Sequence, residues 1–207
     1  MNILFFGGTG FFGKAFLNYI SSLENHNINS LTIAGRNAQN FLSLNSGFEK
    51  LPNVNFINAD ILGDLNHLRE TNYTHVIHAA ADSTNVTGLN PSNRYSQIVD
   101  GTKNVLDFIK ENLPKSKILF ISSGGVYGDM PHNMNSFSEN YHGEVNNLNS
   151  KNVYSVAKRT AEHLCAIYHD EFDIKVSIAR CFCFSGIHLP LNVHFAIGNF
   201  IKDIVDN

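Results

Sequence analysis

The sequence predicts an α/β fold, a doubly wound parallel sheet that is covered by helices on both faces. Short apolar runs bounded by turn residues alternate with longer segments whose apolar residues recur at helical spacing. A glycine-rich turn, Gly7 to Gly13, joins the first apolar run to the first helical segment. Strands that alternate with helices through a whole chain form parallel sheets with right-handed crossovers.

The first half of the chain contains four predicted strands. Asn2 to Phe6 is a short apolar run that ends at Gly7, and apolar residues then recur at helical spacing from Gly13 to Ile20. The other three predicted strands are Ser30 to Ala34, Val54 to Asn58 and Thr74 to Ala79. The last of these is almost unbroken in its apolar character, which suits a parallel strand covered on both faces.

The second half contains two long predicted helices and two more strands. In Asn93 to Glu111 apolar residues recur at positions i, i+3, i+4 and i+7, the pattern of an amphipathic helix. Residues 129–150 are rich in Asn, His and Ser and show no period, so we expect a long surface loop there. The remaining predicted elements are a strand Lys117 to Ser122, a helix Val153 to His169, a strand Lys175 to Ala179 and a helix Phe195 to Val205.

Composition excludes several classes of protein. The 207 residues carry a formal net charge of -3, which gives no electrostatic footprint for a polyanion, so neither nucleic acid nor an anionic membrane is an expected partner. No apolar run approaches the roughly 18 residues of a membrane span, and no basic segment of a secretory signal precedes one. The 3 cysteines are too few for a disulfide framework, which favours a cytoplasmic protein.

Gly7 to Gly13 has the spacing of a dinucleotide-binding turn. Gly8, Gly10 and Gly13 satisfy Gly-x-Gly-x-x-Gly, and the alternative Gly-x-x-Gly-x-x-Gly begins at Gly7. Glycines suit such a turn because the backbone must approach a pyrophosphate closely, while the helix N-terminus points its N–H groups at the phosphates. A motif placed between the first strand and the first helix therefore predicts a cofactor site; the alternative is a flexible glycine loop without a ligand.

The ends of the second and third predicted strands indicate which dinucleotide is bound. An NAD site would place a carboxylate on the ribose 2′-hydroxyl roughly twenty residues after the glycines, but the second strand is followed by Arg36 and not by an acid. Arg36 could pair with a 2′-phosphate, which favours NADP over NAD, or be a solvated loop residue. Asp60, which precedes Ile61, could accept a hydrogen bond from an adenine amino group or only cap the next helix.

Tyr154 and Lys158 lie four residues apart in the second long helix, which places the phenol and the ammonium on one face. A neighbouring cation favours the phenolate and lowers the pKa of a tyrosine, which is about 10 when unperturbed. Such a phenol can exchange a proton with a substrate hydroxyl while hydride moves to a nicotinamide. The pair could arise by chance, but Ser122 and Ser123 also place hydroxyls at the carboxyl edge of a strand, where open α/β folds bind ligands.

Five segments of the chain, in this order, resemble signatures of the extended short-chain dehydrogenase/reductase family, the NAD(P)-dependent nucleotide-sugar epimerases, dehydratases and reductases. The resemblance extends over the whole chain. It implies a Rossmann-like domain and hydride transfer at C4 of a nucleotide sugar, in the family's common setting of polysaccharide synthesis. The five segments are Gly7 to Gly13, His78-Ala79-Ala80-Ala81, Gly101 to Leu106, Ser122 to Gly128 and Tyr154 to Lys158.

The resemblance also assigns roles to individual residues. Tyr154 would be the general acid/base, Lys158 would lower its pKa and bond the nicotinamide ribose, and Ser123 would hold the substrate oxygen. Ser122 is the less favoured of the two serines, because the family's catalytic hydroxyl lies three residues before the Val of Val-Tyr-Gly. The residues that the resemblance and the turn together predict to bind the cofactor are Gly7, Gly10, Phe11, Phe12, Gly13, Arg36, Asp60, Ile61, Ala79, Ala80, Ala81, Tyr154 and Lys158.

Two departures from the family pattern narrow the expected reaction. In 4,6-dehydratases an Asp-Glu pair follows the active-site hydroxyl and supplies the acid and base that elimination of water needs, whereas here the two positions are Gly124 and Gly125. We therefore expect a 4-epimerase or a 4-ketoreductase, and the missing acid after the second strand favours a reductase that uses NADPH. Cys183 stands where the family's asparagine contacts the sugar nucleotide, which leaves that contact open.

We expect residues 1–180 to form the NAD(P)-binding domain and residues 181–207 to begin a substrate-binding lobe, so that the chain is truncated relative to the family. A nucleotide sugar is the expected partner, no metal site is expected, and the helices near Asn93 and Val153 could pair in a homodimer, as is common in the family. The intact Ser123, Tyr154 and Lys158 favour an enzyme. The short chain favours the alternative, a non-catalytic dinucleotide-binding or regulatory protein, or an inactive fragment.

Overall fold

Six parallel strands form one sheet in the order β3-β2-β1-β4-β5-β6. The computed structural model describes residues 1–23, 26–45, 47–48, 51–69, 71–82, 88–191 and 196–206. The strand order reverses between β1 and β4, as in doubly wound sheets that bind dinucleotides. The predicted Rossmann-like fold is therefore confirmed. The strands are β1 (Asn2–Phe6), β2 (Ser30–Gly35), β3 (Val54–Asn58), β4 (His75–His78), β5 (Lys117–Ser123) and β6 (Lys175–Cys181).

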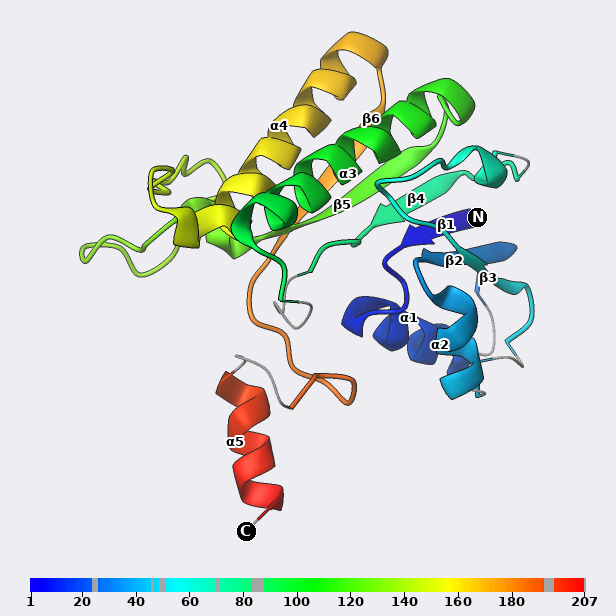
Figure 1. Ribbon diagram of the computed structural model, residues 1–207, viewed down its shortest axis with the longest axis horizontal. Coiled ribbons are helices and arrows are strands. Elements are labelled where there is room, and N and C mark those ends of the chain that lie inside the picture. The colour runs from blue at the N-terminus through cyan, green and yellow to red at the C-terminus, as the bar shows by residue number, and fades with distance from the viewer. Residues whose placement is uncertain are drawn as a thin grey trace.

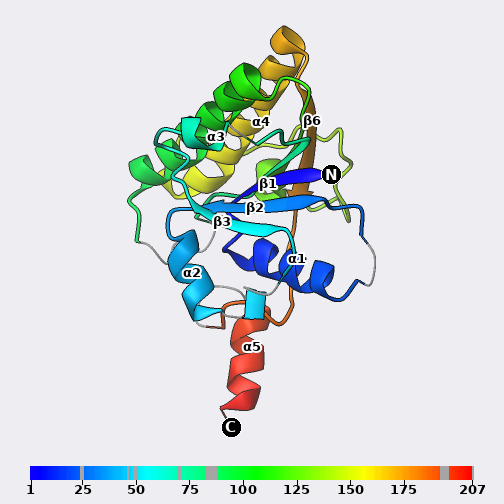
Figure 2. The ribbon, with the colours of Figure 1, turned by 90° about the vertical axis from the view of Figure 1, so that its right-hand side faces the viewer.

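Helices cover both faces of the sheet (Figure 1). One pair, α1 (Phe11–Ser21) and α2 (Ala38–Leu44), lies on one face, and the long pair α3 (Pro91–Asn112) and α4 (Val153–Phe172) lies on the other (Figure 2). The last helix, α5 (Ala196–Val205), lies apart from the sheet in both views; Phe195, its predicted first residue, is outside the described residues. Three short 3₁₀ helices complete the described elements, η2 (Asn66–Leu68), η3 (Gly124–Tyr127) and η4 (Ser150–Asn152).

The hydrophobic core has one cluster on each face of the sheet. Alternate residues of β1 point to opposite faces, so Leu4 and Phe6 pack toward α3 and α4 while Ile3 and Phe5 pack toward α1 and α2. All four side chains are buried. Burial on both faces explains why this strand reads as an unbroken apolar run and not as an alternating one. In the part of the chain that the structure describes, no helix has the length and apolar character needed to cross a membrane.

Candidate functional site

The glycine turn lies where β1, β2 and β4 end side by side. Gly7 has a backbone φ of +81°, and a Cβ atom there would lie 2.7 Å from the Ala79 carbonyl carbon and the Ala80 nitrogen. At Gly13 a Cβ would lie 1.8 Å from the Gly8 carbonyl oxygen, because α1 packs directly onto the turn. These positions therefore require glycine, and the close packing aims the N-terminus of α1 at the carboxyl edge of the sheet.

A cavity of about 220 Å³ opens beside this turn. Eight of the predicted cofactor residues line it, and Thr9, Asp82 and Gln97 are lining residues that sequence reasoning missed. Gln97 accepts a hydrogen bond from the Asp82 backbone nitrogen at 3.0 Å, which joins α3 to the end of β4. Phe11, Phe12, Gly13, Tyr154 and Lys158 are not among its lining residues. The eight predicted cofactor residues that do line the cavity are Gly7, Gly10, Arg36, Asp60, Ile61, Ala79, Ala80 and Ala81.

The two phenylalanines that follow the turn lie in an aromatic cluster at the start of α1. The Phe11 and Phe12 rings meet edge to face with centroids 5.5 Å apart. Phe12 meets Phe184, in the segment after β6, in the same way at 5.1 Å. The cluster therefore connects the glycine turn with the segment after β6, on the side of the sheet that α1 covers.

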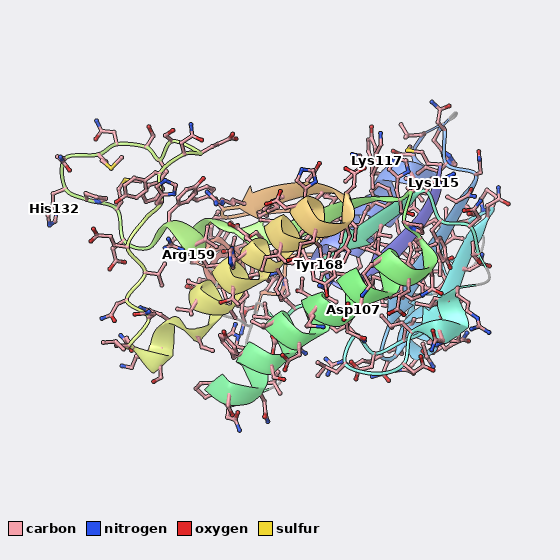
Figure 3. The ribbon with its side chains drawn as sticks, turned by 90° about the horizontal axis from the view of Figure 1, so that it is seen from above. Asp107, Lys115, Lys117, His132, Arg159 and Tyr168 are labelled. Atoms are coloured by element: carbon pink, nitrogen blue, oxygen red, sulfur yellow. The ribbon has the colours of Figure 1, made fainter. Side chains whose placement is uncertain are left out.

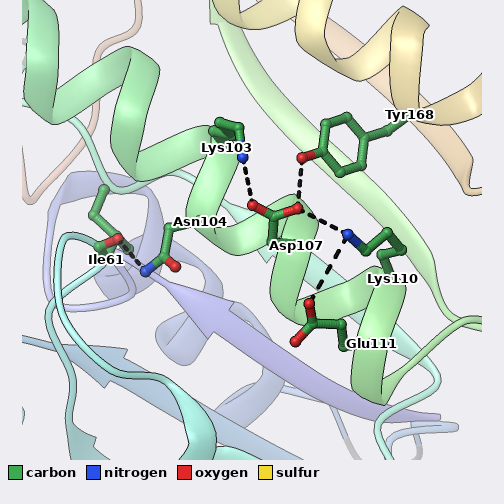
Figure 4. A network of polar contacts seen from close by, with 7 residues as sticks. All are labelled: Ile61, Lys103, Asn104, Asp107, Lys110, Glu111 and Tyr168. Carbon is green, nitrogen blue, oxygen red and sulfur yellow. Dashed lines mark hydrogen bonds and ion pairs between the residues drawn. The ribbon is translucent and has the colours of Figure 1, made fainter.

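The far end of the cavity is formed by the segments that follow β2 and β3. Arg36 is exposed directly after β2, and the Asp60 carboxylate accepts a hydrogen bond from the Leu62 nitrogen at 3.0 Å. The Asn104 side chain of α3 donates to the Ile61 carbonyl at 2.8 Å (Figure 4) and to the Gly63 carbonyl at 2.8 Å. Asp60 thus lines the cavity and organises its own turn, and its hydrogen bond with an adenine amino group stays a prediction.

The signature at the end of β4 is built around a buried histidine. His78 is 2% exposed, and its Nε2 lies 3.1 Å from the Thr102 hydroxyl of α3. Burial, followed by the charge of Lys158, lowers the pKa of His78 from 6.5 to about 3. The imidazole is therefore neutral at physiological pH. Its contact with Thr102 joins the end of β4 to α3, directly before the Ala79–Ala81 segment that lines the cavity.

The three predicted catalytic residues come together at the carboxyl edge of β5. Ser123 ends β5, Tyr154 lies in the first turn of α4, and Lys158 follows one turn later. The Lys158 Nζ lies 5.9 Å from the centre of the Tyr154 ring and donates to the Ile121 carbonyl at 2.6 Å. Lys158 is buried at 3% exposure, under the β5 strand end that carries Ser123.

The electrostatics of the pair differ from the expectation. Burial raises the pKa of the Tyr154 phenol above its ordinary value, although the Arg94 guanidinium and the Ser123 hydroxyl act in the opposite direction. Burial also lowers the pKa of Lys158 to about 8. Loss of water around the phenol thus outweighs the lowering of its pKa by Arg94 and Ser123, and Lys158 is not among the main groups that shift it. The role of Lys158 as the pKa-lowering group stays a prediction.

The two adjacent serines have different partners. Ser122 donates to the buried Glu162 carboxylate of α4 at 2.6 Å, and Arg180 of β6 binds the same carboxylate at 2.8 Å. Ser123 accepts from the Gly125 nitrogen at 3.1 Å and lies toward Tyr154. Ser122 is thus part of a network that joins β5, α4 and β6, which leaves Ser123 as the serine at the site.

An aromatic stack fixes the long loop next to this network. The Tyr127 ring stacks on Phe137 with centroids 4.8 Å apart and on Phe182 at 6.1 Å, and the Arg180 guanidinium lies 4.7 Å from its centre. Residues 129–150 form the predicted loop, and its tip at His132 extends away from the sheet (Figure 3). Tyr127 therefore packs against the loop.

The two glycines that follow Ser123 lie in crowded surroundings. A Cβ at Gly124 would lie 2.6 Å from the Phe182 ring, and a Cβ at Gly125 would lie 2.7 Å from the Ser155 hydroxyl. Contacts this short require the neighbours to move. An acidic pair at these positions would thus require the exposed Phe182 ring and the Ser155 side chain to move.

The long helices carry a polar network on their outward surfaces. The Asp107 carboxylate of α3 binds Lys103 at 2.7 Å, Lys110 at 3.2 Å and the Tyr168 hydroxyl of α4 at 2.6 Å (Figure 4). Asp107 and Tyr168 come from adjacent helices that lie side by side over the sheet (Figure 3). The apolar faces of both helices pack on the sheet, and a homodimer through α3 and α4 stays a prediction.

Comparison with known proteins gives consistent matches. The model of the NAD dependent epimerase/dehydratase family matches residues 3–207. UDP-glucuronic acid decarboxylase 1 of Xenopus tropicalis is 28% identical over 96% of this chain and 45% of its own length. A probable dTDP-glucose 4,6-dehydratase of Sinorhizobium fredii is 30% identical over 87% of this chain and 53% of its own. The chain thus spans about half the length of these curated relatives.

Solved structures show the same likeness. The UDP-glucuronic acid 4-epimerase of Bacillus cereus in complex with NAD is 25% identical and covers 100% of this chain and 64% of its own, with a TM-score of 0.80. A dTDP-glucose 4,6-dehydratase of Bacillus anthracis in complex with NAD, 23% identical, has a TM-score of 0.81. The fold of the described strands and helices is therefore shared with enzymes whose structures contain NAD.

Proposed function

The chain belongs to the NAD dependent epimerase/dehydratase family, and on this premise we propose that it binds a nicotinamide dinucleotide at the glycine turn and acts at C4 of a nucleotide sugar. The observation that carries the proposal is the position of Ser123, Tyr154 and Lys158 at the carboxyl edge of β5, on the same sheet edge as the glycine turn. Open α/β sheets bind their ligands at this edge.

The residues around the turn fit a dinucleotide. Gly7 and Gly13 leave the backbone free to approach a pyrophosphate, since any side chain there would collide with Ala79 or Gly8. The first turn of α1 presents backbone N–H groups, and none of the described side chains caps it. Asp60 and Arg36 line the end of the cavity where the adenosine would lie. When bound, the cofactor supplies the acceptor and donor of hydride for the sugar.

The named activities of the relatives share a chemical requirement at C4. A 4-epimerase must change the configuration of C4, and a 4,6-dehydratase acts between C4 and C6. A glucuronic acid loses carbon dioxide readily once C4 is a ketone, because the ketone is then β to the C6 carboxylate. Removal of hydrogen from C4 serves all three reactions, so this step is the one that we extend to this chain.

The proton at the sugar O4 is the part of the reaction that this chain's residues perform. The Tyr154 phenolate accepts that proton, and the Ser123 hydroxyl holds the same oxygen by a hydrogen bond. Lys158 adds positive charge below about pH 8, where it stays protonated, and it is anchored to the Ile121 carbonyl. In an epimerisation Tyr154 returns the proton to O4 as hydride returns to C4. In a ketone reduction the protonated Tyr154 phenol donates a proton to O4 as hydride is delivered to C4.

The surroundings of Gly124 and Gly125 favour a 4-epimerase or a 4-ketoreductase over a 4,6-dehydratase. Elimination of water needs an added acid and base next to the active-site hydroxyl. Glycine supplies neither group, and the side chains nearest to Gly124 and Gly125 are those of Phe182 and Ser155. The apolar Phe182 ring can neither give nor accept a proton.

The proposed preference for NADP depends on Arg36. The described residues of β2 include no carboxylate, and Arg36 is exposed at its end where a 2′-phosphate would lie. We expect Arg36→Ala to weaken NADP binding and to leave NAD binding nearly unchanged. Equal loss of affinity for both cofactors would contradict this preference.

The test of the catalytic proposal is Tyr154→Phe. We expect this variant to bind the dinucleotide like the wild type and to lose turnover of a panel of UDP- and dTDP-linked sugars. Tyr168→Phe is the matched control, because Tyr168 lies on the same helix and bonds Asp107 away from the site. Turnover retained by Tyr154→Phe would refute the role of Tyr154.

A further inference from the structure

A second cation lies on the Tyr154 ring. The Arg94 guanidinium carbon is 5.0 Å from the centre of this ring, closer than the 5.9 Å of the Lys158 Nζ. Arg94 lies in the first turn of α3, whereas Lys158 lies one turn beyond Tyr154 on α4. The phenol is therefore placed between cations from two helices.

The position of Arg94 is fixed by its surroundings. Its Nε and one Nη both donate to the Asp82 carbonyl, at 3.1 and 2.9 Å. The first turn of α3 is itself held, because Pro91 begins the helix and the Asn90 side chain accepts from the Asn93 nitrogen at 2.9 Å. The guanidinium is thus held over the ring by a rigid helix start and by the end of the β4 segment.

Arg94 and Lys158 differ in the permanence of their charge. The Lys158 ammonium is buried against Phe120, and its pKa is lowered to about 8, so its charge is lost as the pH rises above that value. A guanidinium keeps its charge throughout the pH range in which a tyrosine titrates. Arg94 is thus the cation at this phenol that stays charged while Tyr154 loses its proton.

We propose that Arg94 is a positioning residue that stacks on the Tyr154 ring and stabilises its phenolate form. Arg94 reaches the Tyr154 ring from α3, so the strength of the interaction between the guanidinium and the ring depends on how α3 packs on α4. This inference rests on the proposed role of Tyr154, but its test observes the phenol directly and needs no turnover. The groups that act on the phenol from the surrounding elements are Arg94 from α3, Lys158 from α4, Ser123 from β5, Asp82 after β4 and Cys181 at the end of β6.

The experiment is an ultraviolet titration of tyrosinate in the 207-residue chain. Subtraction of the Tyr154→Phe curve from that of each protein isolates the ionisation of Tyr154. For R94Q and R94M, which remove the charge with side chains of similar length, we expect the midpoint to rise by roughly one pH unit, the size expected for a charge about 5 Å away in partly screened surroundings. R94K keeps the charge and should stay close to the wild type.

Arg159→Gln is the matched control, because Arg159 is an arginine of α4 whose described hydrogen bond is to the Gly143 carbonyl. Its midpoint should equal that of the wild type. An unchanged midpoint in R94Q and R94M, or a rise in R94K as large as in R94Q, would overturn the proposal, since the effect would then not be one of charge. Binding of NAD and of NADP, measured on the same proteins, separates this outcome from failure of the proposed function, because absence of binding of both cofactors by the wild type would refute only the latter.

Discussion

Replacement of His78 by glutamine is expected to make the protein less sensitive to acid. The imidazole is buried between Phe6 and Phe120, and within the described structure its Nδ1 has no hydrogen-bond partner. Its pKa is about 3 in the folded protein and 6.5 when it is exposed to water. Between these values the unfolded chain binds a proton that the folded chain does not, so acid favours unfolding.

The magnitude follows from the difference between the two pKa values. The free energy of unfolding contributed by His78 falls by about 1.4 kcal/mol for each pH unit below about pH 6, and by about 2 kcal/mol in total at about pH 5. The loss begins near the unfolded pKa of 6.5 and continues down to about 3. Above the unfolded pKa the contribution does not change with pH.

Urea unfolding at about pH 7 and about pH 5 measures this effect. The wild type should lose about 2 kcal/mol more between the two pH values than His78→Gln. His132→Gln serves as the control, because it also replaces a histidine by glutamine but His132 is exposed on the long loop. Equal acid sensitivity of the wild type and His78→Gln would refute the reasoning.

Two further predictions concern the packing around the site. Glu162→Gln should lower the free energy of unfolding by about 2 kcal/mol, less than for a fully buried ion pair because the Arg180 side chain is 31% exposed. In thermal unfolding the control Glu171→Gln, at an exposed position, should behave like the wild type. A similar loss of stability in both variants would contradict a stabilising role of the network of Ser122, Glu162 and Arg180. Gly124→Ala should destabilise the protein because its Cβ would lie 2.6 Å from the Phe182 ring, and Phe182→Ala should relieve that loss in the double variant. Additive losses in urea unfolding would show that this contact is unimportant.

Much of the fold follows from local patterns. The alternation of apolar strands with amphipathic helices predicted the six strands of the sheet, because parallel strands buried on both faces read as short apolar runs. The glycine turn was predictable for a similar reason, since a side chain at Gly7 or Gly13 has no space. Steric requirements of this kind restrict which residue can occupy a position, so they can be recognised in the sequence.

Contacts between elements that are far apart in the sequence could not be predicted from such local patterns. The periodicity of Asn93 to Glu111 identifies the apolar face of α3, but not that Arg94, in its first turn, lies over Tyr154. That contact depends on how α3 packs on α4. Burial of the Tyr154 phenol, which raises its pKa, is likewise a property of the assembled site and not of the Tyr-x-x-x-Lys spacing.

Calorimetric titration of NAD and NADP into the wild type, Gly13→Ala and Gly47→Ala tests the central claim most directly. A Cβ at Gly13 would lie 1.8 Å from the Gly8 carbonyl oxygen, whereas a Cβ at Gly47 would have no atom of the described residues within 4 Å. We predict that the wild type and Gly47→Ala bind the dinucleotide alike and that Gly13→Ala binds at least roughly tenfold more weakly. Equal binding by all three proteins, or no binding by the wild type, would contradict the assignment of the glycine turn as a dinucleotide site.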